Sequence, residues 1–175
     1  RIPGRGVMVR LEGKVAVVTG GGRGIGRAVA LGLAREGARV VVAARSTGQV
    51  RQVAEEIARH GGEAVAVECD VSQEAAVKAM ISEVIKRYGR LDVLVNNAGV
   101  GNIRPVWGTP QASFERVLAV NLVGTFLCTK HAWRPMRQGG GGAIINVSSL
   151  GGLHGYPLLS AYCASKWGQI GFTLA

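Results

Sequence analysis

At 175 residues with 47% hydrophobic residues, the chain is one domain long and can bury a sizeable core, which excludes a disordered protein. Its formal net charge of +10 suggests nucleic acid as a partner, but the basic residues are scattered and no basic run is interleaved with aromatic residues, so we expect no nucleic-acid binding. No apolar run reaches the ~20 residues that span a bilayer, and the three cysteines form no CxxC pair, so we expect no membrane segment, no metal site and a cytoplasmic location.

The first seven residues differ in character from the rest of the chain. The chain begins at Arg1, whereas the sequence from Met8 reads as a natural start. We therefore expect a single domain over residues 8–175 and a non-native or upstream extension over residues 1–7.

Short apolar runs alternate with amphipathic helical stretches along the chain. The expected strands are 14–20, 39–45, 63–71, 91–99 and 142–149, and the expected helices are 26–37, 46–62, 72–89, 113–138 and a last one from 160 onward. Continuous Val, Ile and Ala strands with helices between them predict an α/β fold, a doubly wound parallel sheet of the Rossmann type. Ligands on such sheets bind at the carboxyl ends of the strands.

The first strand runs directly into TGGGRGIG, residues 19–26. Glycines that follow a strand and open a helix let backbone amides approach a pyrophosphate, and the helix N-terminus favours its negative charge. A tight turn without a ligand is the alternative. The residues that we expect to bind a nucleotide here are Thr19, Gly20, Arg23, Gly24, Ile25 and Gly26.

The end of the second strand predicts which nucleotide is preferred. An acidic side chain at this place binds the ribose 2′-hydroxyl of NAD, but here the sequence has Ala44 followed by Arg45. Arg23, inside the glycine loop, could face the same ribose. Two guanidinium groups suit a 2′-phosphate, so the sequence favours NADP(H) over NAD(H), unless both arginines are ordinary surface charges.

Polar residues also follow the third and fourth strands. Asp70 and Val71 close the third strand, and Asp70 could accept a hydrogen bond from an adenine amino group. Asn97, Ala98 and Gly99 close the fourth and could let the backbone lie along the cofactor ribose. Each of these segments could instead be a simple turn. The third helix is expected to begin with Ser72 as its N-cap.

A serine, a tyrosine and a lysine gather at the end of the chain. Ser149 ends the fifth strand, and Tyr162 and Lys166 lie one turn apart on the last helix. A neighbouring ammonium favours the phenolate form of a tyrosine, which lets it exchange a proton with a carbonyl or alcohol oxygen. Ser149 could donate a hydrogen bond to the same oxygen.

Taken together, these motifs resemble the short-chain dehydrogenase/reductase family from Leu11 to Ala175. The matching residues are Thr19, Gly20, Gly24, Ile25, Gly26, Asp70, Asn96, Asn97, Ala98, Gly99, Asn121, Ser149, Tyr162 and Lys166. The resemblance implies Tyr162 as the acid/base and Lys166 as both its modulator and an anchor for the cofactor ribose. It also implies Ser149 as the substrate-orienting hydroxyl, and Asn121 as the residue that holds a water linking Lys166 to solvent.

The resemblance carries further expectations about the whole protein. It is to the soluble subgroup that includes 3-oxoacyl-acyl-carrier-protein reductases and sugar or polyol dehydrogenases, which implies an NADP(H)-dependent oxidoreductase of a small carbonyl or alcohol and a homodimer or homotetramer. The family fold has seven strands and this sequence has room for five, so we expect a fold truncated at its C-terminus. A non-catalytic nucleotide-binding fragment is the alternative, and epimerase relatives are disfavoured by the glycine spacing.

Overall fold

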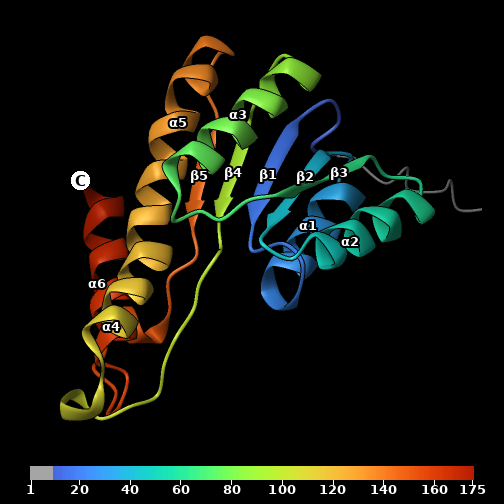
Figure 1. The fold of residues 1–175 in the computed structure, drawn as a ribbon. Helices are drawn as coiled ribbons and strands as arrows, with labels where there is room; N and C mark the ends of the chain where they lie inside the picture. Colours follow the sequence, from blue (N-terminus) through green and yellow to red (C-terminus); the bar gives the residue numbers. More distant parts are fainter. Residues whose placement is uncertain (1–9) are drawn as a thin grey trace, which may run out of the picture.

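A single parallel sheet organises residues 10–175, the part of the chain that the computed structural model describes (Figure 1). The expectations of a start at Met8 and of an extension over residues 1–7 lie outside the described residues. The strands are β1 (Val15–Thr19), β2 (Arg39–Ala44), β3 (Ala64–Glu68), β4 (Val93–Asn96) and β5 (Ala143–Asn146). They pair in the order β3-β2-β1-β4-β5, all in parallel, which confirms the predicted doubly wound α/β fold.

Helices cover both faces of this sheet. They are α1 (Gly24–Arg35), α2 (Thr47–Arg59), α3 (Glu74–Tyr88), α4 (Gln111–Leu118), α5 (Gly124–Gln138) and α6 (Ser160–Leu174). Neighbouring strand residues point to opposite faces, so that Val15 and Val17 pack with α3 and α5 while Ala16 and Val18 pack with α1 and α2. This double burial explains why the central strands β1 and β2 are almost continuously apolar, with Thr19 and Arg39 at their ends as the exceptions.

The expected helix over 113–138 is longer and less regular than its sequence indicates. It begins at Gln111, and a π-helical segment, η2 (Ala119–Val123), separates α4 from α5. By length and composition alone Gln111–Gln138 could cross a membrane, contrary to the expectation of no membrane segment. Its residues Leu127, Cys128, Ala132 and Met136 are nevertheless buried in the core cluster that packs against the sheet.

The prediction of Ser72 as a helix N-cap is wrong. Gln73 occupies the N-cap position of α3 without a side-chain capping bond, and Ser72 instead donates two hydrogen bonds to Asp70, from its amide at 3.0 Å and from its hydroxyl at 2.7 Å. The short turn between β3 and α3 therefore uses the serine to fix the aspartate. This matters because Asp70 lies at the carboxyl end of the sheet, where a ligand is expected.

Candidate active site

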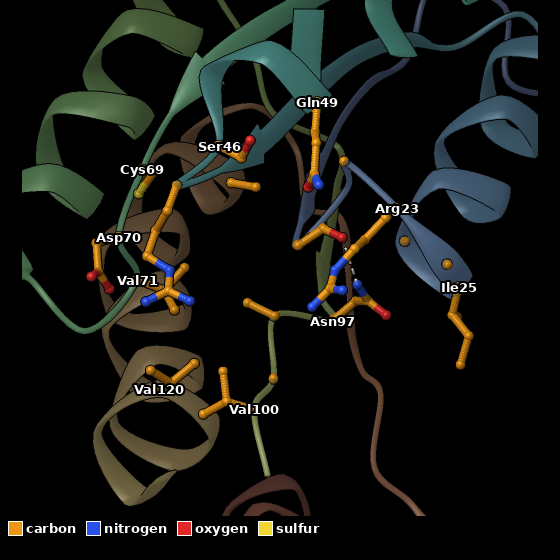
Figure 2. Close-up of a pocket in the computed structure, with 18 residues that line it drawn as sticks. Arg23, Ile25, Ser46, Gln49, Cys69, Asp70, Val71, Asn97, Val100 and Val120 are labelled. Atoms are coloured by element: carbon orange, nitrogen blue, oxygen red, sulfur yellow. Dashed lines mark hydrogen bonds between the residues drawn. The ribbon is translucent and has the colours of Figure 1, made fainter. Parts of the chain in front are cut away.

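A cavity of about 430 Å³ opens at the carboxyl ends of β1, β2, β3 and β4 (Figure 2). Most of the residues predicted to bind a nucleotide line it, namely Gly20, Arg23, Gly24, Ile25, Gly26, Arg45, Asp70, Val71, Asn97, Ala98 and Gly99. Figure 2 shows Asp70 and Val71 on one side and Arg23 and Ile25 on the other. Four loops that are far apart in sequence thus meet at one place.

The glycine loop is tight because two of its positions leave no room for a side chain. A Cβ at Gly26 would collide with the carbonyl oxygen of Gly20 and with Nδ2 of Asn97. Gly20 itself has a φ of +63°, which L side chains adopt rarely. The loop thereby brings the first turn of α1 to the cavity. That turn has no side-chain cap and no acidic residue, so its amides suit an anion.

Thr19 supports this loop from beneath and does not line the cavity. Its side chain is buried, and its hydroxyl donates to the carbonyl of Val95 at 3.2 Å and accepts from the amides of Asn97 and Ala98 at 3.0 and 3.1 Å. The Asn97 amide group donates in return to the carbonyls of Thr19 and Gly20. The two residues therefore tie the loop after β1 to the loop after β4.

Thr19→Val should test this clamp. Valine keeps the shape but removes the three hydrogen bonds of the hydroxyl, two of them from partly buried amides, so the free energy of unfolding should fall by on the order of 3 kcal/mol. Thr19→Ser keeps the hydroxyl and is the matched control. Urea unfolding of both variants measures the difference, and a gap below about 0.5 kcal/mol would contradict a structural role for the hydroxyl.

Asp70 is held in its charged form. Burial alone would raise the pKa of this carboxyl, but the two hydrogen bonds from Ser72 and the positive charges of Arg45 and Arg116 together keep the pKa below its ordinary value. An ionised carboxylate at the cavity wall is a hydrogen-bond acceptor only, which suits an amino group of a ligand.

Sequence reasoning missed seven residues that line the cavity: Gly22, Ala44 as a lining residue, Ser46, Gln49, Cys69, Val100 and Val120. Ser46 and Gln49 follow β2 at the start of α2, so their position directly after a strand could have indicated them. Burial and then the charge of Asp70 raise the pKa of the Cys69 thiol to about 11, which disfavours the reactive thiolate form.

Tyr162 lies beside this cavity rather than in its wall. Its ring is enclosed by two glycines, since a Cβ on Gly101 would lie 3.4 Å from the ring and one on Gly151 would lie 3.2 Å from it. Gly101 belongs to the loop that leaves β4, and Gly151 to the short helix η3 (Leu150–Gly152). The sequence did not single out either glycine, because they become neighbours of the ring only in the fold.

The structure brings Ser149 and Lys166 to the same place. The hydroxyl oxygen of Ser149 accepts from the amide of Gly151 at 3.1 Å, which leaves its O–H free to donate. The Lys166 ammonium nitrogen lies 5.9 Å from the centroid of the Tyr162 ring and donates to the carbonyl of Val147 at 2.7 Å. Burial lowers the pKa of Lys166 to about 8.

Asn121 joins the two halves of the site. It lies in η2 with no solvent exposure, and its side chain accepts from the amide of Val100 and donates to the carbonyl of Val100 and to the hydroxyl of Ser165. Ser165 in turn donates to the carbonyl of Tyr162 at 2.7 Å. The side chain thus fixes the loop after β4 against α6; its predicted role in holding a water stays a prediction.

No cluster of three or more histidine, cysteine, aspartate or glutamate side chains that could hold a metal ion occurs within residues 10–175. The polar groups at the cavity and beside it include the glycine loop, the two arginines, Asp70 and the group formed by Ser149, Tyr162 and Lys166.

Comparison with known proteins places these features in a family. The model of the family described as short chain dehydrogenase matches residues 14–175. A 3beta-hydroxysteroid dehydrogenase of Mediterraneibacter gnavus is 42% identical over 97% of this chain and 61% of its own length. A 3-oxoacyl-[acyl-carrier-protein] reductase of Synechocystis is 41% identical over 95% of this chain and 68% of its own.

A solved structure extends the likeness to three dimensions. A metagenomic short-chain oxidoreductase in complex with NADP superimposes with a TM-score of 0.91 at 43% identity, covering 94% of this chain and 75% of the other. The chain spans 61–64% of the length of the first curated relatives that it matches.

Proposed function

Since this chain belongs to the short-chain dehydrogenase family, we propose that the intact protein is an oxidoreductase that uses NADP(H) and interconverts a carbonyl and a secondary alcohol. The observation that carries the proposal is a single juxtaposition. An uncapped helix N-terminus at a cavity with two arginines lies beside a serine, tyrosine and lysine cluster. When bound, the nicotinamide cofactor supplies or accepts the hydride.

The cavity residues suit a dinucleotide phosphate. The first turn of α1 and the glycine loop would hold the pyrophosphate, and Asp70 would accept from the adenine amino group. Arg23 and Arg45 would bind a 2′-phosphate, and no acidic residue follows β2 to repel it. The loop of Asn97, Ala98 and Gly99 would carry the ribose toward Tyr162.

In this proposal the cluster of Ser149, Tyr162 and Lys166 transfers the proton to and from the substrate oxygen. In the reductive direction Tyr162 gives its phenolic proton to the substrate carbonyl oxygen, and Ser149 donates a hydrogen bond to the same oxygen. Lys166 favours the phenolate that results, because its ammonium lies near the ring. One N–H of the ammonium remains to hold a ribose hydroxyl, since Val147 and Gln169 accept the other two.

The substrate class stays broad within this proposal. Relatives are named for a steroid and for a 3-oxoacyl chain on a carrier protein, and our candidates are a 3-oxoacyl thioester and a sugar or polyol. The residues between Ser149 and Tyr162 that we expect near the substrate, among them Leu150, Leu153 and Tyr156, are largely apolar and exposed. Apolar side chains at this place favour the 3-oxoacyl thioester over a sugar or polyol as the substrate.

We further propose a cytoplasmic homodimer or homotetramer. Phe126 and Trp133 on α5 and Trp167 on α6 are each between 45 and 60% exposed, and such aromatic side chains are typical of subunit contacts. Size-exclusion chromatography with light scattering measures the oligomeric state; a monomer would contradict this part of the proposal.

The decisive experiment for the function is an assay of the intact protein with NADPH and NADH against ketones, 3-oxoacyl thioesters and sugars. Turnover with NADPH is the expected result. Binding of NADPH without turnover on any of these classes would favour the alternative of a non-catalytic nucleotide-binding protein, and failure to bind either cofactor would overturn both.

Arg45→Asp should reverse the cofactor preference. It removes a partner of the 2′-phosphate and adds a repulsive charge, so the ratio of kcat/KM for NADPH to that for NADH should fall by about 10- to 100-fold. Arg51→Asp makes the same charge change at an exposed position on α2, outside the cavity wall, and should leave the ratio unchanged. An equal effect of both variants would mean that only the net charge matters.

A further inference from the structure

A chain of buried hydrogen bonds runs behind Lys166. The ammonium donates to Oε1 of Gln169 at 3.1 Å, and Nε2 of Gln169 donates to the hydroxyl of Thr125 at 2.9 Å. Thr125 donates in turn to the main-chain carbonyl of Asn121 at 2.9 Å. Gln169 and Asn121 have no solvent exposure, and Thr125 and Lys166 have at most 4%.

Burial of the polar Gln169 side chain costs free energy unless its amide group is fully hydrogen-bonded. Taking a primary amide out of water costs several kcal/mol unless both of its ends find partners, whereas an apolar side chain of similar length would fill the same space at no such cost. Both ends do find partners here, and the acceptor end is used by Lys166 alone among the described contacts. The buried amide of Gln169 is therefore explained by its hydrogen bond to the Lys166 ammonium.

We propose that Gln169, braced by Thr125, is a positioning residue that holds the Lys166 ammonium beside the Tyr162 ring. The proposal rests on the proposed function for the use that is made of this lysine. Val147 on one side and Gln169 on the other accept two of the three ammonium protons, which fixes the nitrogen on its long flexible stem. The third proton is left for the ribose.

Gln169 is the side chain that accepts a hydrogen bond from this ammonium, and the main-chain carbonyl of Val147 is the other acceptor. Of the elements that pack against α6, η2 and η3 contain no titratable residue, and α4 contributes Glu115 and Arg116; these two side chains and that of His154, which follows η3, are exposed. α5, whose Thr125 and Phe126 contact α6, carries the buried thiol of Cys128 and the basic residues Lys130, His131, Arg134 and Arg137, of which Lys130 and His131 both bond to Glu74 on α3. On α6 itself the buried thiol of Cys163 is the remaining titratable group. Among residues 10–175 no carboxylate forms an ion pair with Lys166.

Two substitutions of Gln169 should move the ionisation of Lys166 in opposite directions. Gln169→Leu removes an acceptor from the charged form, so the pKa of Lys166 should fall by about one unit, and Gln169→Glu places a carboxylate beside it, so that pKa should rise by about one unit or more. The measurement is NMR of lysine labelled with ¹³C at Cε, in the intact cofactor-free protein, with the Lys166 signal assigned by its loss in Lys166→Met. A pKa that both variants leave in place would overturn the proposal.

The same measurement of the Lys166 pKa tests the role of Thr125 and a control variant at Thr173. Thr125→Val should act like Gln169→Leu but more weakly, whereas Thr125→Ser keeps the hydroxyl and should preserve the wild-type pKa. Thr173→Val is the matched control, because its hydroxyl donates to the main-chain carbonyl of Gln169 at 2.7 Å and not to the lysine network. If a Gln169 variant fails to fold, the Thr125 pair decides, and equal pKa values in Thr125→Val and Thr125→Ser would then overturn the proposal.

A purely structural role for Gln169 predicts a different result. It would lower the melting temperature without shifting either the pKa of Lys166 or the pH profile of kcat. The lysine titration uses neither cofactor nor substrate, so it decides the role of Gln169 even if the intact protein shows no turnover, an outcome that would count against the proposed function only.

Discussion

Tyr162→Phe should lower kcat of the intact protein by about 10²- to 10⁴-fold while leaving its Kd for NADPH within about twofold. The variant removes only the phenolic oxygen, which is the proposed proton donor. The ring keeps its place between Gly101 and Gly151, because phenylalanine has the same shape there. The loss should therefore appear in the chemical step and not in cofactor binding.

The control is the same substitution at a remote tyrosine. Tyr88, on α3, has a buried hydroxyl without a hydrogen-bond partner in the described structure, so Tyr88→Phe should leave kcat unchanged. Steady-state rates and NADPH fluorescence titrations measure the two parameters separately. Retention of more than a few per cent of the activity in Tyr162→Phe would mean that another group transfers the proton.

The residues at the ends of the strands were predictable because of how parallel sheets are built. Every strand of such a sheet ends at the same edge, so the glycine loop, Arg45, Asp70 and Asn97 had to converge once the strands were recognised. Apolar runs separated by helical periods were sufficient for that. The sequence therefore predicted the wall of the cavity better than it predicted any single hydrogen bond in it.

The supporting contacts were not predictable, because each joins residues that are remote in sequence. Thr19 was predicted to bind the nucleotide because it opens the glycine loop. Its hydroxyl instead bonds to the loop after β4, where Asn97 lies 78 positions away in the sequence. Gln169 and Thr125 lie 44 positions apart and meet only because α6 packs beside the long helix. Periodicity describes which face of a helix is buried but not which polar atom on that face finds a partner.

The π-helical segment is a similar case. Nothing in AVNLV departs from an ordinary helical pattern, and the sequence singled out Asn121 only through a family resemblance. In the structure the amide group of Asn121 bonds to both main-chain groups of Val100, which places the loop after β4 directly against the helix. The irregular turn and this tertiary contact occur together, so local propensity alone could not predict either.

Lys166→Met should lower kcat by at least 10²-fold and also weaken NADPH binding, because in the proposed mechanism the ammonium both favours the phenolate and holds the ribose. The effect of Lys166→Met on the free energy of unfolding depends on pH. Methionine fills the same space without charge, and the buried lysine carries a cost that the variant removes. The carbonyl of Val147 and Oε1 of Gln169 lose a donor in the variant, but that loss does not depend on pH.

The pH dependence follows from the pKa of Lys166, which burial lowers in the folded state to about 8 from its ordinary value of 10.5. Between these two values the unfolded chain binds more protons than the folded one, so the stability of the wild type rises with pH in this window. The cost of the buried charge is fully present below about pH 8 and disappears as the pH approaches 10.5. Relative to Lys166→Met, the wild type should therefore gain on the order of 3 kcal/mol in free energy of unfolding between pH 7 and pH 10.5.

Urea unfolding of the cofactor-free protein at several pH values measures this difference directly. Lys78→Met removes an exposed lysine from α3 and should show a constant offset from the wild type across the same range. A constant offset for Lys166→Met as well would mean that its ammonium is solvated in the folded state. A difference that changes with pH, together with the loss of turnover, would mean that the fold bears the cost of a buried charge because catalysis requires that charge beside Tyr162.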